Sequence, residues 1–121
     1  MNIIIIGAGN VATHLAKRLH EKQHNILQVY NRSLDNARLL ATEVDAEAID
    51  NPQNINLNAD FYLVAISDDA IKIIAELFSP ILPKNKIIAH TSGATSSKVF
   101  QSFFENYGVF YPLQTLYIPD L

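Results

Sequence analysis

Short apolar runs alternate with longer amphipathic segments along this chain. The run Ile3–Ile6 is continuous, β-branched and ended by a glycine, which is typical of a strand covered on both faces. From Val11 to Leu19 the apolar positions recur every three to four residues, as on one face of a helix, and we expect Asn10 to cap it. The start of the chain therefore predicts a strand followed directly by a helix.

The same alternation continues to the end of the chain and predicts an α/β fold. We expect further strands at 26–30, 47–49, 61–66, 87–90 and 109–111, and further helices at 34–44, 69–78 and 97–106. The structure of the connection at 50–58 is left open. Strands that alternate with helices indicate right-handed βαβ crossovers, so the six strands predict a doubly wound parallel sheet of the Rossmann type in one domain, residues 1–121.

Composition narrows the partners that are compatible with this fold. Of the 121 residues, 49% are hydrophobic and 17% charged, which indicates a folded core rather than disorder. A net charge of −3 argues against nucleic acid, and the absence of Cys excludes thiolate catalysis and disulfides. Neither a signal peptide nor a membrane span is visible, and His14, His20 and His24 form no metal site, so we expect a cytoplasmic protein without a metal.

A glycine motif joins the first predicted strand to the first predicted helix. Gly7 permits a sharp turn, Gly9 permits close approach of a pyrophosphate, and the small Ala12 permits close packing of the helix on the sheet. The N–H groups of Asn10 and Val11 at the helix start would face the phosphates. The alternative is a tight turn without a ligand. In this position the motif predicts a dinucleotide site.

The end of the second predicted strand bears on the choice of dinucleotide. NAD enzymes commonly carry an acid there, whereas this chain has Asn31, Arg32 and Ser33. Arg32 can pair with a 2′-phosphate and cover the adenine, with Asn31 and Ser33 as donors, so we expect NADP in preference to NAD. The alternative makes Arg32 a solvated surface residue and Ser33 only a helix cap. Asp35 is explained by the dipole of the following helix.

Two further strand ends carry candidate site residues. After the strand at 61–66, Ala65 and Ile66 could lie beneath the nicotinamide ribose and Asp68 could reach a hydroxyl. The alternative is that Ser67 or Asp68 caps the next helix and Asp69 complements its dipole. After the strand at 87–90, His90 could donate a proton to the product of hydride transfer, and the hydroxyls of Thr91 and Ser92 could hold a carbonyl or imine. The alternative is a polar turn with a satisfied histidine.

Phe100, Phe103 and Phe104 have helical spacing and are either core or a docking surface. We expect part of this aromatic set to be exposed and to mediate self-association.

Five motifs resemble the amino-terminal domain of a family of Rossmann-like NADP-binding oxidoreductases of unknown substrate. That family is related to pyrroline-5-carboxylate reductase, deazaflavin-dependent NADP oxidoreductases and 6-phosphogluconate dehydrogenase-like proteins. The resemblance implies a helical carboxyl-terminal domain, not found in these 121 residues, and a homo-oligomeric full-length parent. The motifs are Gly7–Ala12, Asn31–Ser33, Ala65–Ala70, His90–Ala94 and Tyr111–Thr115.

The leading hypothesis is the NADP-binding domain of an oxidoreductase that transfers hydride between a nicotinamide cofactor and a small carbonyl or imine substrate. The alternative is a non-enzymatic NADP-binding sensor or scaffold. Hydride exchange by the full-length parent would distinguish them, because a sensor binds without turnover.

Overall fold

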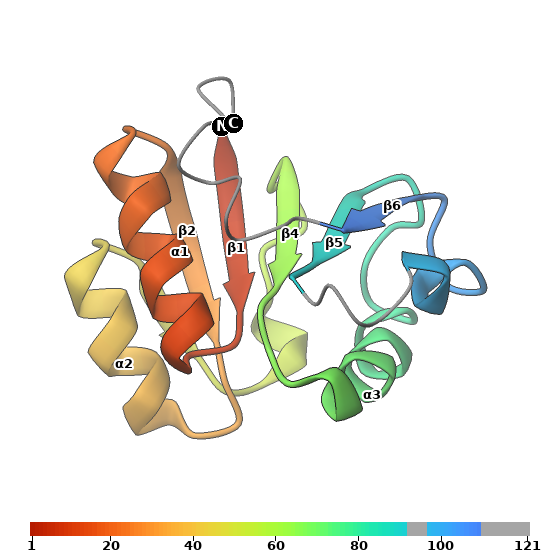
Figure 1. Cartoon of the computed structure of the whole chain (residues 1–121), viewed down its shortest axis with the longest axis horizontal. Coiled ribbons are helices and arrows are strands. Elements are labelled where there is room, and N and C mark those ends of the chain that lie inside the picture. Colours follow the sequence, from red (N-terminus) through yellow and green to blue (C-terminus); the bar gives the residue numbers. More distant parts are fainter. Residues whose placement is uncertain (92–96, 110–121) are drawn as a thin grey trace.

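Six parallel strands form one sheet in the computed structural model, which describes residues 1–91 and 97–109 (Figure 1). The order across the sheet is β3-β2-β1-β4-β5-β6, and every neighbouring pair is parallel. This order reverses direction at β1 and β4, as in a doubly wound dinucleotide-binding fold, and confirms the predicted fold class. The strands are β1 (Asn2–Ile6), β2 (Asn25–Tyr30), β3 (Glu47–Ile49), β4 (Phe61–Val64), β5 (Ile87–His90) and β6 (Asn106–Val109).

The connecting helices are α1 (Asn10–Glu21), α2 (Leu34–Glu43) and α3 (Asp68–Phe78), with short 3₁₀ turns η1 (Pro52–Asn54) and η2 (Ser97–Phe100). Figure 1 shows α1 and α2 together at one side of the molecule, and α3 and η2 at the other. Within the described part of the chain, no helix has the length and apolar character needed to cross a membrane.

Alternate residues of each strand enter two separate cores, because successive side chains of a strand point to opposite faces. Ile3 and Ile5 of β1 pack with the buried faces of α1 and α2. Ile4 and Ile6 pack with α3 and the segment 97–104. Both faces of β1 are therefore buried, which explains the unbroken isoleucine run.

The predicted helix at 97–106 was wrong, and the sixth strand, predicted at 109–111, begins earlier than predicted. Only one 3₁₀ turn forms, and the N–H groups of both Phe103 and Phe104 donate to the Phe100 carbonyl at 2.9 Å. The 3₁₀ turn and the hydrogen-bonded turn that follows it bring the aromatic residues together without a longer helix. The strand then begins at Asn106, and Gly108, expected after a helix end, pairs with Ala89 in the sheet. Residues 110–121, including the motif Tyr111–Thr115, lie outside the described residues.

Most of the aromatic set belongs to the core. Phe100 is 0% and Phe104 3% exposed, and their rings meet edge to face with centroids 6.0 Å apart. Phe103 is partly buried against the same core. The expected docking surface is therefore wrong for Phe100 and Phe104, because η2 covers the sheet at the place where a helix was expected.

A buried amide organises the connection between β3 and β4. The Gln28 side chain donates from Nε2 to Glu47 Oε1 at 2.7 Å and to the Asn54 carbonyl at 3.0 Å, and its Oε1 accepts from the Asn56 N–H at 2.8 Å. The Tyr62 hydroxyl donates to the Asn56 carbonyl at 2.6 Å, and burial raises its pKa. The Gln28 side chain thus links β2 by hydrogen bonds to one residue of β3 and to two residues of the connection after it.

Replacing Gln28 with leucine is expected to lower the free energy of unfolding by about 1 to 2 kcal/mol, because two backbone groups of the connection lose their partner. Urea denaturation of the two proteins measures the difference. The matched control is Gln53→Leu, since Gln53 is an exposed residue of the same connection. Equal losses from both substitutions would show that the network does not stabilise the fold.

Candidate functional site

The carboxyl ends of β1, β2, β4 and β5 open into one cleft of about 770 Å³. Parallel strands end at the same edge of the sheet, and the sheet order reverses there, which is where such folds bind ligands. Most of the predicted cofactor residues line this cleft, whereas Ala12 and Ser33 do not, and neither does His90, the predicted proton donor. Those that line it are Gly7, Gly9, Asn10, Val11, Asn31, Arg32, Ala65, Ile66 and Asp68.

Backbone hydrogen bonds extend the sheet by one residue along the floor of the cleft. Four residues lie directly after their strands, and each donates its N–H to the carbonyl of the last residue of the neighbouring strand at 2.8–3.2 Å. They therefore occupy equivalent positions along the edge of the sheet, about 4.8 Å apart from one strand to the next. In order across the sheet, these residues are Asn31, Gly7, Ala65 and Thr91.

Gly7 is required by the fold itself. Its φ of +126° is a conformation that side-chain-bearing residues rarely adopt. A Cβ at this position would press on the carbonyl oxygen of Ala65 and lie 2.9 Å from Ile66 Cγ2. The close approach of β1 to the segment after β4 accounts for this glycine without any ligand.

Gly9 has no such requirement. Its φ of −82° and ψ of −163° are open to any residue, and a Cβ built on it would meet no atom within 4 Å. Gly9 is the N-cap of α1, its carbonyl accepts from Thr13 N–H at 2.9 Å, and no side chain caps the helix. Asn10, expected to be the cap, is the first helical residue. The protein thus leaves open both the space beside Gly9 and the first N–H groups of α1.

Ala12 and Ser33 have roles outside the cleft. Ala12 is fully buried between α1 and the sheet, which agrees with close packing of the helix. The Ser33 hydroxyl accepts from the Asn36 N–H at 3.3 Å and caps α2. The capping alternative left open for Ser33 is therefore the role that the structure shows, and its contact with a cofactor stays a prediction.

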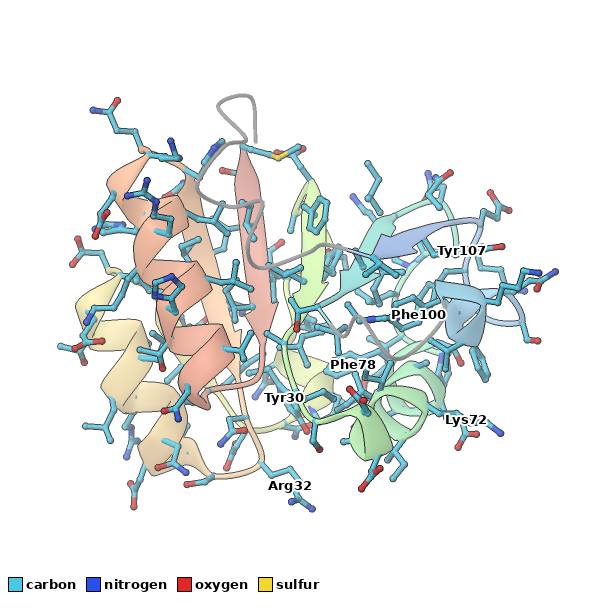
Figure 2. All side chains as sticks on the ribbon, viewed as in Figure 1. Tyr30, Arg32, Lys72, Phe78, Phe100 and Tyr107 are labelled. Carbon is cyan, nitrogen blue, oxygen red and sulfur yellow. The ribbon has the colours of Figure 1, made fainter. Side chains whose placement is uncertain are left out.

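Arg32 extends from the end of β2 at the margin of the cleft (Figure 2). It is exposed and forms no ion pair within the described residues. Tyr30 lines the same cleft and packs edge to face against Phe78, with centroids 5.1 Å apart. Burial raises the pKa of the Tyr30 hydroxyl, while the nearby Arg32 charge lowers it and the Asp50 charge raises it. Among the described residues, Arg32 is thus a cation without an ion-pair partner, close to an aromatic ring of the cleft.

The strand β4 is shorter than predicted, and the helix α3 that follows it begins one residue earlier than predicted. β4 ends at Val64, so Ala65 and Ile66 lie beyond it, and α3 already begins at Asp68. Ser67 is the N-cap, but no side chain caps α3. The capping alternative for Asp68 is therefore wrong. Asp68 is exposed in the first turn and borders the cleft.

His90 and Thr91 lie on opposite sides of the sheet. His90 is fully buried, and its ring lies 5.5 Å, centroid to centroid, from Phe100. Thr91, the next residue, lines the cleft. The alternation of side chains along β5 explains the difference. The catalytic role of His90 stays a prediction, and Ser92 lies outside the described residues.

Sequence reasoning missed several residues that border the cleft. Tyr30 was assigned only to a strand, and Ile73 only to a helix, although Ile73 is 63% exposed. Thr91 was expected at the mouth of the sheet, but as a hydroxyl for the substrate rather than as a residue of the cofactor site. The position of Thr91 directly after a strand was a usable signal, because it is the same position that Gly7 and Ala65 occupy. The exposure of Ile73 was not, because it depends on how α3 packs.

Comparisons with known proteins agree with this geometry. A solved structure from Bacteroides fragilis, described as an NADP oxidoreductase, is 36% identical with a TM-score of 0.86, covering 91% of this chain and 43% of that one. Glutamyl-tRNA reductase from Methanosphaera stadtmanae is 45% identical over 64 residues, or 51% of this chain and 16% of that enzyme. A Coxiella burnetii pyrroline-5-carboxylate reductase shares the fold, with a TM-score of 0.74, 23% identity and coverage of 85% and 39%.

The chain therefore spans less than half the length of each of these proteins. Residues 2–93 match the sequence model of the family described as NADP oxidoreductase, coenzyme F420-dependent. With the sheet order and the glycine loop in place, this match confirms the predicted resemblance. The chain belongs to the coenzyme F420-dependent NADP oxidoreductase family and has the nucleotide-binding Rossmann fold of oxidoreductases.

Proposed function

We propose that this chain is the NADP-binding domain of an oxidoreductase that transfers hydride between the nicotinamide and a small carbonyl or imine substrate. The observation that carries the proposal is the open space beside Gly9. A glycine that neither φ nor packing requires is explained by a ligand that needs the room. A pyrophosphate at the uncapped start of α1 would fill that room and accept from its free N–H groups.

The cleft has the extent that a dinucleotide needs. From Asn31 to Thr91 the edge of the sheet crosses three inter-strand steps, roughly 14 Å at the usual strand spacing. The glycine loop lies between these two ends. A pyrophosphate held at the loop would therefore direct one nucleoside toward β2 and the other toward β4 and β5.

Charge at the β2 end supports NADP over NAD. Arg32 borders the cleft and forms no ion pair with any residue of 1–91 or 97–109, and Asn31 stands where NAD enzymes commonly carry an acid. The nearest acid along the chain, Asp35, is exposed and lies 3.9 Å from Arg38. The guanidinium of Arg32 is therefore free to pair with a 2′-phosphate.

When bound, the cofactor supplies or accepts a hydride at nicotinamide C4. The residues of this chain hold its phosphates and orient its nicotinamide end over β4 and β5, which brings the reacting centre to the substrate side. We propose a small-molecule substrate and a homo-oligomeric protein. Exchange of hydride with such a substrate would separate this proposal from a sensor or scaffold, which binds the cofactor without turnover.

Parallel equilibrium titrations with NADPH and NADH test the proposal. We expect both to bind and NADPH to bind more tightly, measured through the fluorescence of the reduced nicotinamide. Equal affinities would contradict the preference for NADP. Failure of both to bind would contradict the assignment of the cleft.

A further inference from the structure

We propose that Thr91, the residue directly after β5, binds the nicotinamide half of the dinucleotide through its hydroxyl and so contacts the reactive end of the cofactor. This inference rests on the proposed function. It assigns Thr91 to the cofactor, whereas the sequence pattern offered its hydroxyl, with that of Ser92, to a carbonyl or imine of the substrate.

Thr91 is a nearly buried polar residue whose side chain borders the cleft. It is 8% exposed and lines the cleft at the end of β5. The Thr91 N–H donates a hydrogen bond to the Val64 carbonyl at 3.2 Å, which fixes the backbone. No hydrogen bond joins the Thr91 hydroxyl to another described residue. A polar group so little exposed usually has a partner, so a ligand in the cleft is the natural one.

The order of strands decides which part of a dinucleotide would reach it. Arg32, the cation suited to a 2′-phosphate, follows β2, on one side of the glycine loop. Thr91 follows β5, two strands away on the other side of β1. A dinucleotide anchored at both Arg32 and the loop therefore extends its other nucleoside toward Thr91. That half offers the hydroxyls of its ribose and the carboxamide of its ring as hydrogen-bond partners.

His90, the last residue of β5, points to the face of the sheet opposite to Thr91. His90 is 0% exposed and lies against Phe100, on the face covered by α3 and η2. Because side chains alternate across the sheet, a strand that buries His90 on that face directs Thr91 to the opposite one. Ala89, two residues before Thr91, indeed packs in the core of α1 and α2.

The test compares Thr91→Val with wild-type protein in binding two ligands: NADPH, and 2′,5′-ADP, which has the phosphorylated adenosine half but no nicotinamide half. Valine has the shape of threonine without the hydroxyl. We expect NADPH affinity to fall about 3- to 10-fold, the range for one neutral hydrogen bond, and 2′,5′-ADP affinity to stay unchanged. Thr91→Ser should restore NADPH affinity. Both affinities can be measured by calorimetry.

The matched control is Thr42→Val, because Thr42 is exposed on α2, does not line the cleft and bonds only to the Arg38 carbonyl at 2.8 Å. It should leave both affinities unchanged. Equal weakening of NADPH and 2′,5′-ADP by Thr91→Val, or no weakening of either, would overturn the role of Thr91. If neither ligand binds the wild-type protein, the proposed function itself fails, which is a different outcome. Thermal denaturation confirms that each variant is folded before its affinity is compared.

Discussion

Replacing Gly9 with valine is expected to abolish dinucleotide binding and to leave the fold intact. The new side chain would enter space that no atom of the protein occupies within 4 Å of the Cβ, and that a pyrophosphate needs. The extended backbone of Gly9 suits a β-branched residue. The cost to stability is that of a poorer N-cap, about 1 kcal/mol or less. NADPH titration and urea denaturation of the same preparation measure the two effects.

Gly7→Ala is the contrasting variant, and it should act in the opposite way. Its Cβ would meet the backbone of Ala65, and its φ of +126° is strained for alanine, so we expect it to destabilise the protein by several kcal/mol. Comparing the two variants would thus show that the fold requires Gly7 and that ligand binding requires Gly9. A folded Gly9→Val protein that still binds NADPH normally would show that the loop is not the phosphate site.

Replacing Arg32 with alanine is expected to remove most of the preference for NADPH over NADH. A charge-assisted contact with the 2′-phosphate contributes about 1.5 to 3 kcal/mol, so NADPH affinity should fall roughly 10- to 100-fold while NADH affinity changes little. The structure shows no ion pair of Arg32 within the described residues, so its loss should not alter the fold. Titrations at low and moderate salt should show the preference of the wild-type protein weakening as salt increases.

Arg38→Ala is the matched control for charge. Arg38 is an exposed arginine of α2 that does not line the cleft and lies 3.9 Å from Asp35. Its removal should change NADPH affinity far less than removal of Arg32. If the two substitutions weaken NADPH binding equally, the preference for NADPH reflects the overall positive charge near α2 rather than a contact with Arg32.

Local patterns were enough to predict the first half of the chain. The isoleucine run, the glycine loop and the amphipathic stripe that follows are signals between near neighbours, and β1 and α1 form where they predict. The strands at 47–49 and 87–90 were predicted with the bounds that the structure has. The segment 97–109 was not, because the spacing of Phe100 and Phe104 is satisfied equally by a helix and by the compact turns that pack on β5 and α3.

The sequence by itself determined the fold class and the place of the candidate dinucleotide site, because strand periodicity, helix periodicity and the glycine spacing are patterns of residues close together in the chain. The tertiary structure decided how each candidate residue lies in the cleft. It made Gly7 a requirement of packing and left the space beside Gly9 open, because only Gly7 lies against Ala65. It also buried His90 and brought Thr91 to the cleft. The face to which a strand residue points depends on which helices cover each side of the sheet, and that is set by contacts between segments far apart in the chain.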